Sequence, residues 1–145
     1  MWKEYIQSLD AGCKFQPPAT EEQIAEVEAY LSVPLPEELR QLLLESNGVE
    51  SENGDSIVFS TKGIFGTNEE MRNDKEFAEL FMPFDNLLFF ADDIGGNFFG
   101  YGITKCGIVT DMIFCWDHDS DNRLSVHWKL KPYLKWYLEG FPELP

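Results

Sequence analysis

Basic residues are scarce in this sequence, and their scarcity excludes two classes of partner. Only 11 lysines and arginines stand against 26 aspartates and glutamates, which gives the 145-residue chain a formal net charge of −15. A field of this sign repels phosphate backbones and anionic lipid head groups, so we expect no binding to nucleic acid or to a membrane. The same field attracts a basic protein and speeds its encounter with the chain, although acidity can also serve solubility alone.

Cysteine and histidine are also in short supply. The three cysteines include no C-x-x-C pair, which excludes a disulfide framework and a zinc knuckle. The two histidines, His118 and His127, are nine residues apart without a cysteine cluster nearby, so we predict no metal site and no cofactor. Long apolar runs and the features of a signal peptide are missing too, and we expect a protein of the reducing cytoplasm.

Known catalytic motifs are missing from the sequence. It contains no G-x-S-x-G nucleophile elbow, no P-loop and no G-x-G-x-x-G turn. Cys115 has no basic neighbour to activate its thiol, and its aromatic surroundings favour a place in the core. A carboxylate pair of Asp92 or Asp93 with Asp117 would suit a hydrolase, but nothing else marks a sugar groove. We therefore predict that the protein is not an enzyme.

The chain does have the material for a folded core. Hydrophobic residues make up 43% and aromatics 14%, which argues against disorder, and the length favours one domain over residues 1–145. Helical spacing of apolar residues predicts helices from Trp2 to about Gly12, from a Thr20–Gln23 capping box to Pro34, and from Pro36 to Asn47.

After Gly48 the helical period gives way to alternation. The pattern predicts short strands at 57–59, 63–65, 87–91, 98–104, 108–116 and 124–128, a short helix within 73–81, and a closing helix over 132–139. The predicted fold is α+β, with N-terminal helices, a central antiparallel sheet and a C-terminal helix, the helices packing on one face of the sheet.

Two acidic segments follow predicted strands. In the first, the glycines at 95 and 96 let the chain reverse at positive φ, which leaves Asp92 and Asp93 at the mouth of a hairpin. The second is Trp116–Asp119, where we expect Trp116 to be partly exposed. The stretch from Glu45 to Asp93 alone holds twelve acids and three bases, or −9 of the net −15. This concentration of charge favours a surface for a basic partner over a catalytic cleft.

The second acidic segment also begins a calcium-like spacing. Asp117, Asp119 and Asp121 take positions 1, 3 and 5 of such a loop, but Asn122 replaces the glycine at position 6 and Trp128 the glutamate at position 12. The segment also follows a strand instead of a helix, so the sequence favours a solvated acidic loop.

Several of these segments together resemble the SUKH superfamily, in its Smi/Knr-like branch. The resemblance runs from about Thr20 to Leu138, while the stretch Thr67–Phe84 has no firm counterpart. The matching segments are Ala19–Ile24, Leu35–Leu43, Asn47–Val49, Asp92–Tyr101 and Trp116–Asp119.

The resemblance implies an α+β domain of the kind found as immunity proteins in bacterial toxin systems. Such proteins bind a cognate toxin, often a nuclease, and block it, and no catalytic residues come with the family. Related fungal domains are regulatory scaffolds in cell-wall synthesis, so a protein-binding adaptor without a toxin is the alternative. A homodimer through the aromatic strands also stays open. We assign partner binding to eight residues, namely Glu69, Glu70, Asp92, Asp93, Trp116, Asp117, His118 and Asp119.

Overall fold

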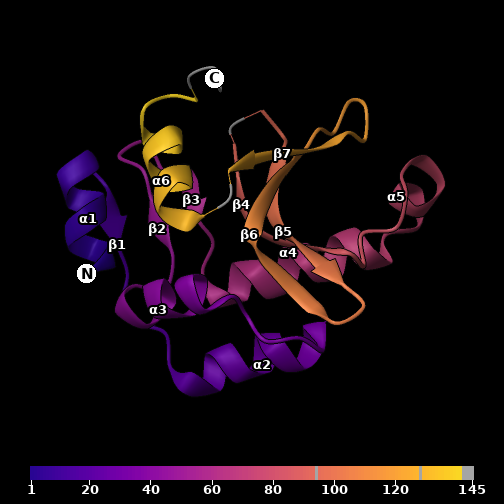
Figure 1. The fold of residues 1–145 in the computed structure, drawn as a ribbon, viewed down its shortest axis with the longest axis horizontal. Helices are drawn as coiled ribbons and strands as arrows, with labels where there is room; N and C mark the ends of the chain where they lie inside the picture. The colour runs from indigo at the N-terminus through magenta and orange to yellow at the C-terminus, as the bar shows by residue number, and fades with distance from the viewer. Residues whose placement is uncertain (94, 128, 142–145) are drawn as a thin grey trace.

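Helices at both ends of the chain enclose two antiparallel sheets (Figure 1). The computed structural model describes residues 1–93, 95–127 and 129–141, without the side chains of 109–111. The elements are α1 (Trp2–Leu9), β1 (Lys14–Phe15), α2 (Glu21–Leu31), α3 (Glu37–Glu45), β2 (Val49–Glu50), β3 (Ser56–Val58), α4 (Thr61–Asn73), α5 (Lys75–Leu80), β4 (Leu87–Asp92), β5 (Phe98–Thr104), β6 (Gly107–Trp116), β7 (Arg123–His127) and α6 (Leu130–Leu138).

The predicted α+β class is confirmed, and the central strands divide into two sheets. One sheet has the order β1-β2-β3 and the other the order β4-β5-β6-β7, with every neighbouring pair antiparallel. The two sheets meet where the Phe59 N–H donates to the Phe90 carbonyl at 2.7 Å. The predicted capping box is also present, since Thr20 and Gln23 exchange side-chain and backbone hydrogen bonds at the start of α2.

The strand predicted at 63–65 is wrong, because these residues form the first turns of α4. Ser60 begins this helix, and its side chain accepts a hydrogen bond from the Gly63 N–H at 3.1 Å. The buried stripe of α4 includes Ile64, Asn68 and Met71. A polar residue in the middle of that stripe hides the helical period from a reading of apolar positions.

Asn68 is buried because it completes the edge of a sheet. Its side-chain amide donates to the carbonyls of Ile64 and Phe89 at 2.7 and 2.9 Å, and its oxygen accepts from the Phe89 N–H at 2.9 Å. Arg72 continues this contact one turn later by donating to the Leu87 carbonyl at 2.9 Å. Helix α4 therefore covers strand β4, whose backbone would otherwise be an open sheet edge.

Each face of the four-stranded sheet carries an aromatic cluster. On one face Phe90, Phe99 and Tyr101 pack on α6, where Tyr133 lies 5.2 Å from Phe90 between ring centroids. The opposite face has a smaller aromatic cluster, made of Met71, Phe84, Leu87, Phe89 and Trp116, with Phe77 and Phe81 packed against it. The end of α4 and the segment around α5 thus reach the face that α6 does not cover.

Trp116 belongs to this second cluster, so the predicted partial exposure of Trp116 is wrong. Its side chain is 3% exposed and lies edge-on to Phe81 and Phe84, with ring centroids 5.1 and 5.2 Å away. The residues that cover it come from the stretch after α4, which has no firm counterpart in the family resemblance. Trp116 therefore supports the loop that follows it from the inside of the fold.

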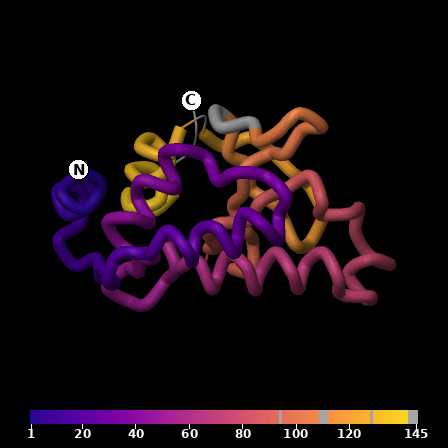
Figure 2. Tube along the Cα trace, turned by 90° about the horizontal axis from the view of Figure 1, so that it is seen from below, coloured from indigo at the N-terminus to yellow at the C-terminus, as the bar shows by residue number. Residues whose placement is uncertain are grey.

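Helices α2 and α4 lie side by side, as the view from below shows (Figure 2). Tyr30 of α2 packs on Phe65 of α4 with ring centroids 4.8 Å apart. This helix pair is at the opposite end of the molecule from the turn between β4 and β5 (Figure 1).

Candidate functional site

The two acidic segments lie together at one end of the four-stranded sheet. The turn between β4 and β5 and the loop between β6 and β7 are joined by Asn97, whose side-chain oxygen accepts from the His118 N–H at 3.1 Å. The same oxygen lies 2.7 Å from the Nδ1 atom of His118. Asp92 and Asp93 are thereby held close to Asp117 and Asp119, although more than twenty residues separate them in sequence.

Local hydrogen bonds fix the shape of the first turn. One carboxylate oxygen of Asp93 accepts from the N–H groups of Gly95 and Asn97 at 2.7 and 3.0 Å. Gly96 has a φ of 97°, and a Cβ atom there would lie 3.3 Å from the His118 ring. The turn therefore needs glycine both for its backbone conformation and for its contact with the neighbouring loop.

A further carboxylate reaches this end from the other sheet. Burial, followed by the charges of Asp93 and Asp55, raises the pKa of Asp92 to about 6. Asp55 lies just before β3, in the loop after β2. It was missed from the sequence because its nearness to Asp92 depends on how the two sheets meet, which no local pattern reveals.

The negative field of this end also acts on uncharged neighbours. The pKa of the Cys115 thiol is raised to about 11, mainly by burial and then by Asp93 and Asp117. A thiol of this kind stays protonated near neutral pH, so it cannot act as a nucleophile. The Tyr137 hydroxyl donates to the Asp92 carbonyl at 2.9 Å and attaches α6 to the base of the turn.

We call Asp55, Asp92, Asp93, Asp117 and Asp119 the acidic end. Within the described residues, its one ion pair joins Asp119 to His118 at 3.4 Å, and the imidazole carries charge only when protonated. No lysine or arginine of the described chain neutralises the other four carboxylates. The acidic end is therefore a coherent region of one sign.

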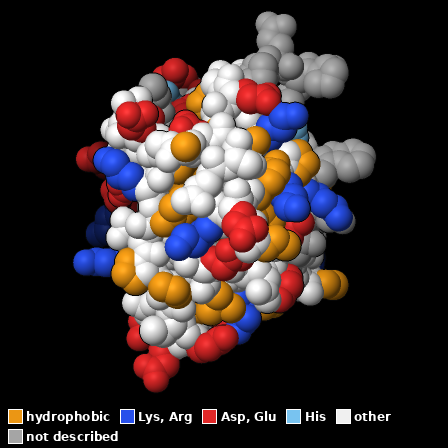
Figure 3. Space-filling view, turned by 90° about the vertical axis from the view of Figure 1, so that its left-hand side faces the viewer, with side chains coloured by type: hydrophobic (Ala, Val, Ile, Leu, Met, Phe, Trp, Pro, Cys, Tyr) orange, Lys and Arg blue, Asp and Glu red, His pale blue; other side chains and the backbone are white. Residues whose placement is uncertain are grey.

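The face over α1 is different. Lysine and arginine side chains lie there among acidic side chains and hydrophobic patches (Figure 3). Lys3 lies 5.5 Å above the Phe15 ring, and Lys131 lies 5.1 Å above the Tyr5 ring. The net charge of the chain is thus unevenly distributed over its surface, and this face has no single sign.

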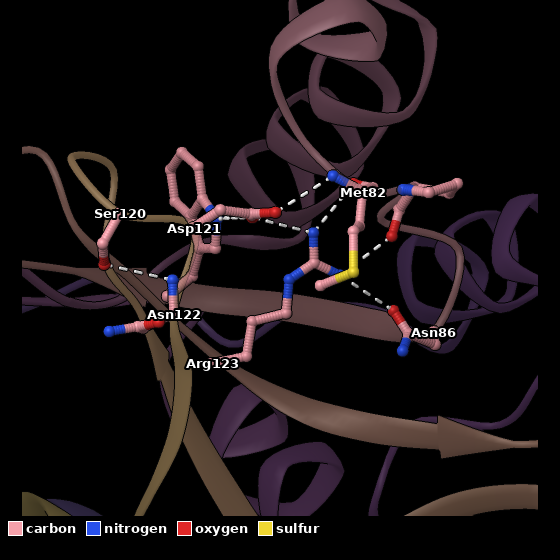
Figure 4. Close-up of polar contacts among 8 residues, drawn as sticks. Met82, Asn86, Ser120, Asp121, Asn122 and Arg123 are labelled. Atoms are coloured by element: carbon pink, nitrogen blue, oxygen red, sulfur yellow. Dashed lines mark hydrogen bonds and ion pairs between the residues drawn. The ribbon is translucent and has the colours of Figure 1, made fainter.

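Asp121 is the carboxylate of the second loop that is fully engaged (Figure 4). It accepts from the Trp116 indole at 2.7 Å, from Arg123 at 3.0 Å and from the Met82 N–H at 3.0 Å. Arg123 in turn donates to the carbonyls of Met82 and Pro83 at 2.8 Å and lies 4.7 Å above the Phe84 ring. These contacts fasten the loop to the segment that follows α5.

With this geometry established, comparison with known proteins gives a family. Residues 18–135 match the SMI1 / KNR4 family (SUKH-1). The chain belongs to this family. The match confirms the resemblance seen in the sequence and spans the elements from α2 into α6, so both turns of the acidic end lie inside the SUKH-1 region. No curated protein matches the chain.

The described residues offer one group of possible metal donors, which lies in the loop between β6 and β7. Donor atoms of Asp117, His118 and Asp119 lie within 4.8 Å of one another, with the last two side chains exposed. His118 already contacts Asn97, and Asp117 accepts from the Asp119 N–H at 2.8 Å. The third carboxylate of a calcium-type loop, Asp121, is held by Arg123 and Trp116 and is not part of this group.

Two of the predicted partner-binding residues lie elsewhere in the SUKH-1 region. Glu69 and Glu70 are exposed on α4, and Glu69 lines a groove with Gln23 and Glu26 of α2. The structure therefore separates these two glutamates from the acidic end. Among the described helices, none combines the length and the apolar character that crossing a membrane requires.

Proposed function

We propose that this SUKH-1 protein is an immunity-type binding protein that neutralises a basic toxin domain, with the acidic end as its contact surface. The observation that supports the proposal is the Asn97–His118 link, which holds two acidic turns together as a group of carboxylates that no lysine or arginine of the described chain pairs with. Membership of the SMI1 / KNR4 family is consistent with an immunity role.

The chemistry of a nuclease toxin fits such a surface. An enzyme that cuts nucleic acid needs a basic groove to attract phosphates, and a group of carboxylates at fixed positions can occupy that groove in their place. The long-range field of the chain would speed the encounter, and the salt dependence of the on-rate would follow from it. The fixed turns lower the ordering cost of binding, because their hydrogen bonds exist before the partner arrives.

A hydrolase role for the same carboxylates has less support. The main cavities in the described part of the chain have other walls, without Asp92, Asp93 or Asp117. A glycosidase needs its two carboxyl groups on opposite sides of a bound sugar. The proposal is accordingly a binding protein without catalysis.

Charge-removing variants test the proposal, with the product of the gene that neighbours this protein's own gene as the candidate partner. In Asp92→Asn/Asp117→Asn/Asp119→Asn each amide keeps the shape of the side chain, and the amide oxygen introduced at position 117 can still accept the turn hydrogen bond. We expect the Kd for the partner to rise between about tenfold and a hundredfold at low salt, with a slower on-rate and faster dissociation both contributing.

The matched control removes three charges from exposed sites on α1, α2 and α5, in the variant Glu4→Gln/Glu22→Gln/Glu79→Gln. It makes the net charge less negative by the same amount as the acidic-end variant does, so only the general field changes and the Kd should move by less than about threefold. Equal weakening by both triple variants, or an affinity that does not respond to salt, would show that the acidic end is not the contact surface.

A further inference from the structure

The two outer edges of the four-stranded sheet differ in how their main-chain groups are satisfied. The edge of β4 is covered, because Asn68 and Arg72 of α4 hydrogen-bond to its backbone. Within the described residues, no strand and no other main-chain group pairs with Arg123–His127 on the side away from β6. The side-chain hydrogen bonds of this strand start from the Arg123 guanidinium and the Ser125 hydroxyl. Strand β7 is therefore an open sheet edge.

The hydrogen bonds of the β6–β7 hairpin show which groups of β7 point outward. The Asp117 N–H donates to the Asn122 carbonyl at 2.9 Å, so these two residues form a hydrogen-bonded pair. Hydrogen-bonded and non-hydrogen-bonded pairs alternate along an antiparallel ladder, so the N–H and C=O groups of Arg123 and Ser125 point away from β6. The register shift of this ladder lies beyond Ser125, toward His127, which leaves the first part of the strand regular.

This edge also lacks the side chains that usually prevent strand pairing. Proline and lysine are missing from Arg123–His127, and the charge of Arg123 is engaged by Asp121. Leu124 is 65% exposed and lies opposite Cys115, on the face of the sheet that α6 packs against. Only another extended chain matches a row of unpaired N–H and C=O groups, and an apolar side chain on that chain would cover Leu124.

The loop before β7 indicates the charge of such a chain. Asp117 and Asp119 of the acidic end lie in this loop, which projects beyond the strands (Figure 1). A strand added antiparallel to β7 has its C-terminal end beside the loop. Lysines or arginines at that end would neutralise the two carboxylates, which no lysine or arginine of the described chain pairs with. A second copy of the chain has the same net charge of −15 and would be repelled.

We propose that β7 receives an extended segment of a basic protein partner as a further strand of the sheet, with an apolar side chain next to Leu124. Lysines or arginines at the C-terminal end of the segment then lie beside Asp117 and Asp119. The proposal rests on the proposed function for the charge of the partner, and it adds the way in which the partner's chain pairs. Main-chain hydrogen bonds to Arg123 and Ser125 supply affinity, and the acidic loop selects a basic segment.

A designed peptide tests this edge without the natural partner. The probe is a cyclic β-hairpin of about 14 residues, whose outer strand carries a valine in its middle and lysines at its C-terminal end. One comparison peptide has glutamates in place of the lysines, and another has N-methyl groups on the outward amides of the same strand. We expect the lysine peptide to bind with a Kd below about 1 mM at low salt and to shift the amide NMR signals of Arg123 and Ser125. Neither comparison peptide should bind.

Variants of the edge then locate the contact. Ser125→Pro removes one outward N–H and leaves the hydrogen bonds to β6 in place, and an edge strand accepts proline at such a position. It should abolish binding of the lysine peptide, whereas Ser125→Ala should change the Kd by less than about twofold. Circular dichroism checks that both variants fold.

A second matched pair keeps the test decisive if Ser125→Pro does not fold. Leu124→Ser should weaken the lysine peptide about fivefold, because the added strand loses its apolar neighbour. The control Leu80→Ser changes a leucine of α5 that is 71% exposed, and it should leave the Kd unchanged. Both leucines are exposed, so neither substitution disturbs the core.

Several results would overturn the proposal. These are unchanged signals of Arg123 and Ser125 at millimolar lysine peptide, an N-methylated peptide that binds as well as the lysine peptide, or equal effects of Leu124→Ser and Leu80→Ser. A concentration-dependent dimer of the free protein that Ser125→Pro abolishes would make a second copy the occupant, and it would also contradict the proposal.

The variant Asp117→Asn/Asp119→Asn separates this test from that of the toxin contact. We expect it to weaken the lysine peptide about fivefold at low salt. If the peptide responded to this variant but not to Ser125→Pro, strand pairing would be wrong and the acidic contact surface would stand. If Ser125→Pro abolished binding while both the charge variant and the glutamate peptide behaved like their parents, the basic character of the partner would be wrong, and the proposed function with it.

Discussion

The acidic end and the Asp121 contact show two opposite uses of aspartate within one sheet. At Asp121 the carboxylate is largely buried, with a side-chain exposure of 16%, and is satisfied by Arg123, Trp116 and a backbone N–H. At Asp92 the carboxylate is half-buried beside other acids, and its pKa is raised to about 6. The first arrangement holds the loop in place, and the second lowers stability and leaves an unpaired negative charge at the proposed contact surface.

The largest change in stability is expected when the contacts of the Asp121 carboxylate are removed. Desolvation alone would raise the pKa of Asp121, but hydrogen bonds from Met82, Trp116 and Arg123 and the charge of Arg123 lower it overall. Asp121→Asn should therefore reduce the free energy of unfolding by about 2 kcal/mol at pH 7, because Arg123 keeps its charge in a partly buried site without a counterion. Urea denaturation monitored by tryptophan fluorescence measures the loss.

Asp119→Asn is the control for that measurement, since it changes an exposed aspartate of the same loop. Its effect should stay within about 0.5 kcal/mol. A lowered pKa means that the stabilisation from Asp121 is present above the unfolded-state pKa and is lost as the pH falls through the folded-state value. If Asp121→Asn were as stable as Asp119→Asn, the loop would not depend on the buried contact.

Removing the charge of Asp92 should stabilise the fold, by a smaller amount than the loss expected at Asp121. Asp92→Asn should raise the free energy of unfolding by about 1 kcal/mol at pH 7.5, a figure that allows for solvent screening of a half-exposed group. Because the folded-state pKa of Asp92 is raised from 3.8 to about 6, the native state binds more protons than the unfolded state between these values. The stability of the natural chain should fall as the pH rises through this window.

The pH profile distinguishes this cause from a general effect of the substitution. The gain from Asp92→Asn should disappear below about pH 3, where the aspartate is protonated in both states. Asp74→Asn would be an unsuitable comparison because Asp74 caps α5, so Glu79→Gln on the exposed side of that helix serves as the control. A gain that persists unchanged at acid pH would mean that neither burial of the ionised carboxylate nor repulsion by Asp93 and Asp55 sets the cost at Asp92.

Prediction from sequence succeeds where a feature depends on residues close together in the chain. The capping box at Thr20 and the strand from Phe98 to Thr104 have the predicted bounds, since both depend on neighbours within a few residues. The α+β class and the family followed from the order of such local signals. The acidic segments were also visible in the sequence, and the hairpin glycines indicated the first turn.

What sequence could not give depends on contacts between distant segments. Asn68 is buried because the backbone of Phe89 satisfies its amide, and this polar core residue interrupts the apolar helical period of α4, so the sequence predicts a strand at 63–65. Trp116 is covered by Phe81 and Phe84, whose position no local period indicates. The separation of Glu69 from the acidic end, and the arrival of Asp55 there, likewise follow from the packing of α4 and of the first sheet.

The smallest expected effect concerns the link between the two acidic turns. His118→Ala removes the ring contact with Asn97 but keeps the backbone hydrogen bond, so the free energy of unfolding should fall by no more than about 0.5 kcal/mol. The amide signals of Gly95 and Asn97 should nevertheless broaden or shift, because the turn loses its packing against the His118 ring. His127→Ala, which changes a histidine on β7 next to Trp136, is the control and should leave those two signals in place. Unperturbed signals in His118→Ala would mean that Asp93 alone fixes the turn, and that the two groups of carboxylates keep their spacing through the sheet without help from the loop.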